Sequence, residues 1–553
     1  MQAYRSIRLL GVGLVCVLAW VLVPGLGSDR LPHPAVSALE ATFVSPLKPE
    51  VVHLEADGSG DYPSLQVALQ TVHAGSVIYL GPGTYGCEGR PFEINRSLAL
   101  IGPGMGQTRV ACDGRDAYVL RFGGESFYAS GITFAREGSH SGSVVEVLSG
   151  ESQFSDCRFT GGVGSWASIV AGSGLYVGGG ARAEVTECEA IANGHGFTFG
   201  ESSSGVVRDS RALDNAQGLL VVDQARLVAE RSAFVRNYSG ARVQESEGAV
   251  IRDCDLSQNE GYGIAVSQGA APLLEGNTCA GNGEAGIYFG HDAQGTARGN
   301  TCSDNGKFGI LVSGFETNEP IRTDVALRPV LEDNVCTGNG EAGIAYSAKG
   351  DCAGEARNNR CTGNGREGIS VGGECRPLLE GNTLQDNPSA GLAFHDSAGG
   401  EATGNTCAGG NYGIYVGVGA DPLLAANDCS LFVQPVPTPT PAPTPTPVVD
   451  VHGSDFAAGT EVLLGPQGIL RGSAWSPEGS ILAAQCYPVR APMGGLCLYR
   501  GPDFSADVRI PAFLVDPPVW SPDGRRIAFV DVKGPQQPDS GAGLVVATAD
   551  GGV

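Results

Sequence analysis

The stretch LLEGNTCAGNGEAGIYFG, residues 273–290, returns in altered form as TARGNTCSDNGKFGILVS at 296–313. The long interval that follows contains FETNEPIRTDVALRP, which indicates a loop inserted into one repeat. A period of about 23 residues, with glycine-rich turns between short apolar runs, predicts three short strands per repeat. Such a unit is one rung of a parallel β-helix. At steps of 23, 34, 25, 23, 23 and 22 residues, its first asparagine recurs as Asn277, Asn300, Asn334, Asn359, Asn382, Asn405 and Asn427.

Columns of the repeat predict how the rungs stack. Three places before each asparagine, leucine and alanine alternate, which lets rungs about 4.8 Å apart interdigitate. We expect the asparagines to form a hydrogen-bonded ladder. The column two places after each asparagine is expected inside, with its cysteines unpaired because their Cβ atoms point the same way. That column contains Cys279, Cys302, Cys336, Cys361, Leu384, Cys407 and Cys429, and we expect it to continue upstream through Cys254, Ser232, Ser210 and Cys188.

The charge of the chain limits its partners. It carries 59 acidic and 35 basic residues, which gives a net charge of −24. Nucleic acids and anionic lipid surfaces bind through basic footprints, so the composition argues against both. A polyanionic sugar would need a bridging cation for the same reason.

Residues 1–27 read as a targeting segment and 28–49 as a linker. Two arginines precede an uncharged run at 9–26, an order that is typical of an export signal. A run of about 18 apolar residues also fits a retained membrane anchor. Pro24 and the small residues after it favour cleavage. In both cases the bulk of the chain lies at the cell surface, in the periplasm or outside the cell, where disulfides form.

The repeats resemble those of right-handed parallel β-helix proteins with pectate lyase-like architecture, over residues 50–433. EADGSGDYPSLQVAL at 55–69 is similar to the start of pectin methylesterases. This resemblance implies an all-β solenoid and, by analogy alone, a carbohydrate ligand. The chain departs from the enzymes: it lacks the glutamine–aspartate motif of pectin methylesterases. NGHGF at 193–197 supplies His195 without the paired aspartates found beside the GHG motif of polygalacturonases.

Acidic residues recur in the loop eight places before the asparagines. Asp292, Asp351 and Glu374 share that position, and Asp396 lies one place from it. The last three belong to successive rungs, so their carboxylates would lie about 5 Å apart. Such a row suits Ca²⁺, which binds six to eight oxygen ligands. The alternative is that these are solvated loop charges. Candidates for a catalytic base are Lys349 and His395, which flank the row, and His195.

Two disulfides are expected outside the cysteine column. Cys352 and Cys375 each lie seven places before an asparagine, hence on adjacent rungs in loops where geometry can adjust. Cys486 and Cys497 flank YPVRAPMGGL, which reads as a hairpin-like loop.

The C-terminal part has a different composition. Proline and threonine alternate in QPVPTPTPAPTPTPV, which predicts an extended polyproline II linker over 434–449. Beyond it, WSPEGSILAA at 475 and WSPDGRRIAFV at 520 resemble the propeller repeats of TolB-like, WD40-type proteins. Residues 450–553 would form two blades, whereas closed propellers have about four to eight. We therefore expect a partial, truncated β-propeller.

Three function classes fit these features. The first is an exported, non-catalytic β-helix scaffold that binds polysaccharide at the cell surface. The second is a polysaccharide-active enzyme, a lyase, epimerase or hydrolase, whose site the motifs do not reveal. The third is a periplasmic metal-handling protein resembling the NosD group, although 3 methionines and 8 histidines argue against copper. The sequence leaves the sugar and the oligomeric state open.

Overall fold

In the computed structural model the chain forms two compact units, Met1–Val436 and Pro437–Val553. The predicted targeting segment and nearly all of both predicted linkers lie outside the described residues. Among the described residues, no helix is long and apolar enough to span a bilayer. The structure describes residues 48–435 apart from 88, 114–116, 165–169, 315–326 and 349–351, and in the second unit 471–475, 481–486, 495–500, 505–511, 519–521, 523, 525–531 and 543–548.

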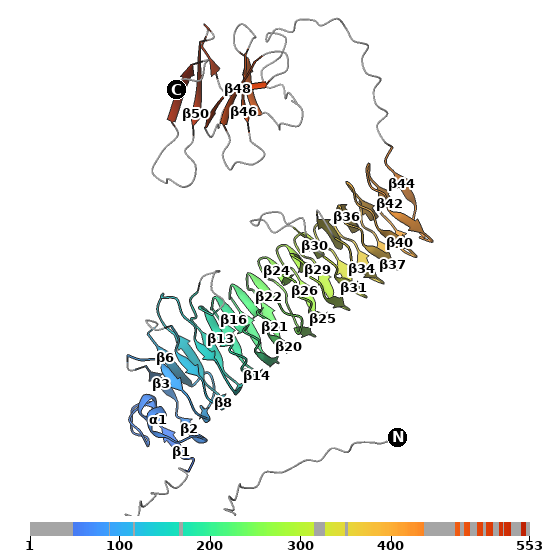
Figure 1. The fold of residues 1–553 in the computed structure, drawn as a ribbon. Helices are drawn as coiled ribbons and strands as arrows, with labels where there is room; N and C mark the ends of the chain where they lie inside the picture. Colours follow the sequence, from blue (N-terminus) through green and yellow to red (C-terminus); the bar gives the residue numbers. More distant parts are fainter. Residues whose placement is uncertain are drawn as a thin grey trace, which may run out of the picture. The chain divides into compact units, whose positions relative to one another are not determined.

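The first unit is an all-β solenoid in which each rung adds one parallel strand to each of three faces (Figure 1). We call these faces A, B and C in chain order. Face A is one 16-stranded sheet and face C one 15-stranded sheet, whereas face B is divided into a 7-stranded sheet B1 and a 6-stranded sheet B2. The parallel β-helix predicted from the 23-residue repeat is confirmed.

The strands are short, as the repeat length requires. Sheet A consists of β1 (Val51–Leu54), β2 (Ser76–Leu80), β5 (Leu98–Ile101), β8 (Ser126–Ser130), β11 (Glu151–Ser155), β14 (Arg182–Thr186), β17 (Ser204–Arg208), β20 (Arg226–Glu230), β23 (Val250–Arg252), β25 (Leu273–Glu275), β28 (Thr296–Arg298), β31 (Val330–Glu332), β34 (Glu355–Arg357), β37 (Leu378–Glu380), β40 (Glu401–Thr403) and β43 (Leu423–Ala425). Sheet B1 consists of β3 (Gly83–Gly86), β6 (Thr108–Cys112), β9 (Thr133–Arg136), β12 (Arg158–Thr160), β15 (Glu189–Ile191), β18 (Arg211–Leu213) and β21 (Ala233–Val235). Sheet B2 consists of β26 (Thr278–Ala280), β29 (Thr301–Ser303), β32 (Val335–Thr337), β35 (Arg360–Thr362), β38 (Thr383–Gln385) and β41 (Thr406–Ala408). Sheet C consists of β4 (Phe92–Ile94), β7 (Leu120–Phe122), β10 (Val145–Val147), β13 (Ser173–Val177), β16 (His195–Phe199), β19 (Gln217–Val221), β22 (Ser239–Gln244), β24 (Tyr262–Ser267), β27 (Ala285–Phe289), β30 (Phe308–Ser313), β33 (Ile344–Ala348), β36 (Glu367–Gly373), β39 (Ala390–Phe394), β42 (Tyr412–Val416) and β44 (Leu431–Val433).

The asparagines from Asn277 to Asn427 lie in one stack at the corner between faces A and B. Nδ2 of Asn277 donates to Oδ1 of Asn300 at 3.0 Å, and the same oxygen accepts from the backbone N–H of Asn277. The pattern repeats at every step to Asn427. Each side chain thereby satisfies backbone groups that would otherwise be buried without partners.

The upstream part of this stack corrects the sequence-based alignment. Cys254 donates its backbone N–H to Oδ1 of Asn277 at 3.1 Å, and the N–H of Cys188 donates to Oγ of Ser210 at 3.0 Å. Ser210 and Ser232 are joined in the same way. These four residues therefore continue the asparagine column, and their assignment to the cysteine column was wrong. A hydroxyl or thiol replaces the amide as the acceptor because it can also lie close to the backbone of the next rung.

A second asparagine ladder runs at the corner between faces B and C, and the sequence analysis missed it. Nδ2 of Asn339 donates to Oδ1 of Asn364 at 2.9 Å and to the carbonyl of Cys302 at 3.1 Å. All its members are buried. They are Asn193, Asn215, Asn237, Asn259, Asn282, Asn305, Asn339, Asn364 and Asn387.

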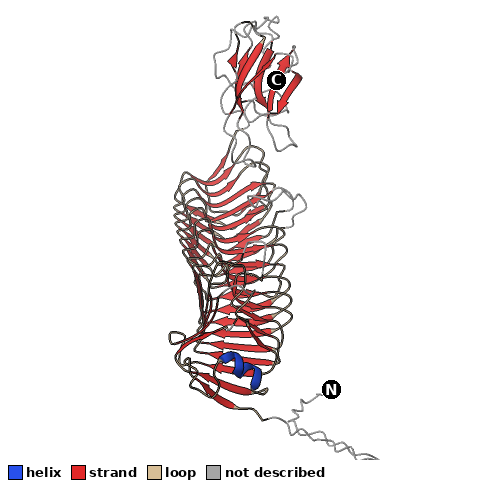
Figure 2. Cartoon of the chain, turned by 90° about the vertical axis from the view of Figure 1, so that its left-hand side faces the viewer, coloured by secondary structure: helices blue, strands red, loops and turns tan. Residues whose placement is uncertain are grey.

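The two ends of the rod differ. Helix α1 (Leu65–Thr71) lies across the N-terminal end (Figure 2) and buries Leu65, Ala68 and Leu69 against it, with Ser64 as its N-cap. At the other end, Leu431 and Val433 of β44 occupy inward positions but are 56% and 58% exposed. No further rung of the described chain stacks on this strand.

Three disulfides join neighbouring rungs. Cys352–Cys375 lies in the loops after sheet C, where the sequence analysis places it. Cys87–Cys112 was not foreseen. Cys407–Cys429, with Cα atoms 4.8 Å apart, contradicts the expectation that cysteines of the interior column stay unpaired. That expectation assumed that both cysteines lie in neighbouring strands, where their Cβ atoms point the same way. Cys429 instead lies beyond the last strand of sheet B2. The other members of the column, Cys279, Cys302, Cys336 and Cys361, are free and buried.

The second unit contains two antiparallel sheets, β45–β48 and β49–β51. The tryptophans of the two WSP repeats, Trp475 and Trp520, end β45 and β49, the first strand of each sheet. The register of β46 and β47 pairs Cys486 with Gly495 and Cys497 with Ala484, and the side chains of both cysteines lie outside the described part of the structure. The propeller and this disulfide remain predictions. The strands are β45 (Arg471–Trp475), β46 (Ile481–Cys486), β47 (Gly495–Arg500), β48 (Ser505–Pro511), β49 (Val519–Trp520), β50 (Arg526–Asp531) and β51 (Gly543–Thr548).

Candidate functional site

The outer face of sheet C carries aromatic side chains in two columns. In the first, strand register aligns Tyr262, Ala285 and Phe308, and further along Glu367, Ala390 and Tyr412. In the second, Tyr288 aligns with Leu311, and Tyr415 with Phe432. The small side chains of Ala345, Ser370 and Ala393 occupy the middle of the second column.

The aromatic side chains form two clusters, one on each side of these small residues. The half-buried Tyr262 stacks on the buried Tyr288 with ring centroids 4.8 Å apart, so Tyr262 is the ring of this pair that a ligand can reach. Four strands, β30, β33, β36 and β39, separate this pair from the second cluster. There Tyr412 of β42 stacks on Phe432 at 4.6 Å, and Tyr415 packs beside both at 5.6 and 5.7 Å.

Between the two clusters lies a groove of about 310 Å³ over β30, β33, β36 and β39. The groove exists because alanine and serine occupy the middle of the second column, whereas large side chains occupy the two ends of that column. Its wall combines apolar surface with three carboxylates, one guanidinium and one imidazole. The lining side chains include Phe308, Leu311, Glu341, Arg366, Glu367, Ser370, His395 and Asp396.

Glu367 is the deepest charged group of the groove, and only 4% of its surface is exposed. It stands between Ala342 and Ala390 of the neighbouring rungs, both of which are buried. Its nearest cationic group is the guanidinium of Arg366 at 3.6 Å, and that side chain is 60% exposed. At 3.6 Å the contact is too long for a hydrogen bond.

The structure brings together two of the predicted site residues. His395 and Asp396 both line the groove, and the ring of His395 packs against Tyr415 at 5.6 Å. Oδ2 of Asp396 accepts from the backbone N–H of Gly373 at 3.3 Å. Glu374 is exposed and lies outside the groove.

The predicted row of carboxylates does not form as expected. Strand register places Asp396 opposite Gly373 and not opposite Glu374. Asp396 follows β39. Asp292 follows β27, which lies four strands earlier in sheet C. Among the described residues, no group of three or more histidine, cysteine, aspartate or glutamate side chains is arranged to hold a metal. Asp351 and Lys349 lie outside the described residues.

His195 is separate from the groove. It begins β16, eight strands of sheet C before β39, and is 5% exposed between the aligned Ser173 and Gln217. His195 therefore does not line the groove that holds His395.

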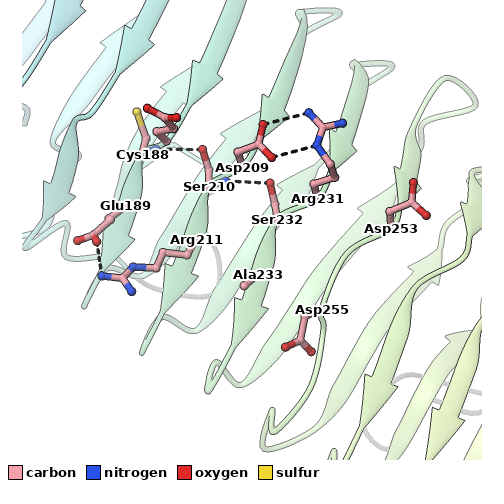
Figure 3. A pocket seen from close by; sticks show the side chains of 11 residues that line it. Cys188, Glu189, Asp209, Ser210, Arg211, Arg231, Ser232, Ala233, Asp253 and Asp255 are labelled. Atoms are coloured by element: carbon pink, nitrogen blue, oxygen red, sulfur yellow. Dashed lines mark hydrogen bonds and ion pairs between the residues drawn. The ribbon is translucent and has the colours of Figure 1, made fainter.

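A larger hollow, of about 710 Å³, lies over sheet B1 (Figure 3). Arg231 donates two hydrogen bonds to Asp209 at 3.0 Å, and Arg211 pairs with the nearly buried Glu189. The hydrogen bond from Arg231 lowers the pKa of Asp209. The hollow opens because Ala233 takes the place that Arg211 holds on the preceding rung. Its two guanidiniums pair with Asp209 and Glu189, the remaining carboxylates of its lining leave it acidic, and no aromatic side chain lines it.

The sequence profile of the family described as right handed beta helix region matches residues 127–271, 234–354 and 347–434, together more than half of the chain. The chain belongs to this family. The right-handed β-helix inferred from the repeats is thereby confirmed over the matched residues. No protein of curated function matches the chain.

Several solved structures resemble this chain at low identity. The mannuronan C-5 epimerase AlgE6 A-module of Azotobacter vinelandii is 18% identical, with 66% of this chain and 94% of that chain covered and a TM-score of 0.38. Pectate lyase Pel9A is 16% identical, with 57% and 80% covered and a TM-score of 0.35. The N-terminal fragment of bacteriophage Phi29 gene product 12 is 16% identical, with 63% and 68% covered and a TM-score of 0.44. These likenesses concern the fold and not a site.

Proposed function

We propose that this β-helix protein is exported and binds a polysaccharide lengthwise along the outer face of sheet C. The observation that carries the proposal is the pair of aromatic clusters on either side of a polar groove. Aromatic rings pack against the apolar C–H faces of sugar rings, while a few placed polar groups bind the hydroxyls.

The spacing of the clusters suits a chain of sugars and not a single sugar. From β24, which begins with Tyr262, to β44, which carries Phe432, the sheet advances by seven strand steps, or about 34 Å. The groove lies between the clusters, so a ligand that stacks at both ends must also cross its polar wall.

Export is supported by the disulfides. Three of them join rungs of the rod, and such bonds persist in extracellular and periplasmic compartments. This agrees with the export signal expected at 1–27.

A second candidate function is cleavage of the same ligand. Glu341, Glu367 and Asp396 share one groove, and glycoside hydrolysis uses paired carboxylates on either side of the scissile bond. Analysis of products after prolonged incubation with each bound glycan distinguishes the two: release of shorter sugars supports cleavage, and unchanged glycan supports binding alone.

The proposal is tested on a glycan array with the full chain, in wild-type form and as Tyr412→Ala. We expect the wild type to retain at least one glycan and Tyr412→Ala to lose most of that signal. Tyr128→Ala is the matched control, because Tyr128 is 36% exposed on sheet A. No retained glycan, or equal loss in both variants, would contradict the proposal.

A further inference from the structure

The charges of the groove select among glycans. Three carboxylates and one guanidinium line it, so its fixed charge is negative before any ligand enters. The whole chain adds to this field with its net charge of −24. A polymer of uronic acids would meet repulsion at the groove, and the described residues provide no metal group to bridge the two.

The carboxylate of Glu367 has one ion-pair partner and accepts no hydrogen bond from the side chains of the described residues. A carboxylate withdrawn from water is stable only when donors or an opposite charge replace its hydration. Glu367 is nine-tenths buried, and its one cationic neighbour stands at 3.6 Å with most of its own surface in solvent. Ala342 and Ala390 on either side are buried and offer no side-chain donor.

The geometry points to a polysaccharide with free amino groups, a glucosamine-type polymer, whose ammonium group binds Glu367. This inference rests on the proposed function and names its ligand class. An ammonium supplies three donors and one positive charge, and the carboxylate of Glu367, which lines the groove, can accept both. Glu341 and Asp396 line the same groove and favour further amino groups of the polymer, while the aromatic clusters bind its ring faces.

The test is calorimetric titration of the full chain with three hexasaccharides: β-1,4-linked glucosamine, its fully N-acetylated counterpart, and galacturonic acid. A buffer of about pH 6 lies between the ordinary pKa values of carboxylates and amines. We expect glucosamine hexasaccharide to bind about tenfold or more tightly than the acetylated form, because a charge-assisted hydrogen bond is stronger than a neutral one. We expect no binding of the galacturonate, and weaker glucosamine binding as salt is raised.

Two glutamate variants locate the effect. Glu367→Gln keeps the shape and removes the charge, so glucosamine binding should weaken about tenfold. Glu275→Gln removes an acid that pairs with Arg298 on sheet A, and it should bind as wild type does. If Glu367→Gln does not fold, Glu341→Gln is measured instead, and we expect it to weaken glucosamine binding as well.

The outcomes separate this inference from the proposed function. Equal or tighter binding of the acetylated or galacturonate hexasaccharide overturns the ligand class and leaves polysaccharide binding in place. Unchanged binding by a folded Glu367→Gln overturns the role of that residue. No binding of any hexasaccharide, together with an empty glycan array, overturns both.

Discussion

The side-chain amide of Asn359 donates to Oδ1 of Asn382 at 3.0 Å and to the carbonyl of Leu331 at 2.9 Å, so one side chain joins three consecutive rungs. Its own Oδ1 accepts two hydrogen bonds from Asn334. The stacking of the rod therefore depends on the same buried residues in successive rungs. Removing one such side chain leaves several buried groups without partners.

We predict that Asn359→Ala destabilises the rod by about 1–3 kcal/mol, the cost of leaving buried hydrogen-bonding groups unsatisfied. The measurement is the midpoint of urea denaturation. Asn411→Ala is the control, because Asn411 is exposed and lies outside both ladders. Equal midpoints for wild type and Asn359→Ala would show that the ladder contributes little.

The unpaired cysteines give a second prediction. Burial raises the pKa of the Cys157 thiol well above its ordinary value and that of Cys254 to about 12. All seven free thiols of the rod are buried and out of reach of reagent, so each should resist alkylation by iodoacetamide at about pH 8 and react once the rod unfolds. Peptide mapping by mass spectrometry would show this, together with the disulfides Cys87–Cys112, Cys352–Cys375 and Cys407–Cys429. Alkylation of Cys279 or Cys302 in the folded protein would contradict the packing.

The ion pairs over sheet B1 predict a pH dependence. The hydrogen bond from Arg231 lowers the pKa of Asp209 in the folded state. The stabilisation is therefore present above the ordinary carboxyl pKa, about 3.9, and is lost as the pH falls through the lower folded-state value. We expect Asp209→Asn to lower the melting temperature at about pH 7 and to have no effect near pH 2.

Scanning calorimetry at the two pH values checks this expectation. Glu401→Gln is the control, since Glu401 is exposed and no described residue forms an ion pair with it. A difference between wild type and Asp209→Asn that is equally large at both pH values would refute the assignment.

Sequence reasoning could predict the rod because one signal, the asparagine that recurs with Asn277, holds a fixed position in every rung from there to Asn427. A second signal was present as well. Asn282, Asn305, Asn339, Asn364 and Asn387 each follow the first column by five residues, and that constant spacing identifies the second ladder. Upstream, serine and cysteine replace asparagine in the first column, and the alignment failed there because it compared residue types and not hydrogen-bonding roles.

The candidate site was less predictable. Counting back from each asparagine assumes loops of equal length, and a difference of one residue places Asp396 opposite Gly373 and not opposite Glu374. The groove depends on which residues of sheet C face outward and on small side chains at Ala345 and Ser370. Neither property can be read from the positions of charged residues alone. The groove is revealed by the inward and outward alternation of residues along the strands of sheet C.

Hydrogen exchange of the full chain, measured by mass spectrometry with and without hexasaccharide, tests the central claim most directly. The probes are glucosamine hexasaccharide and cellohexaose, each at saturating concentration. Polysaccharide binding along sheet C predicts slower exchange in peptides that contain β30, β36 and β42, and unchanged exchange in peptides that contain β25, β31 and β37 of sheet A. Unchanged exchange throughout sheet C with both probes, or protection confined to the hollow over sheet B1, would contradict it.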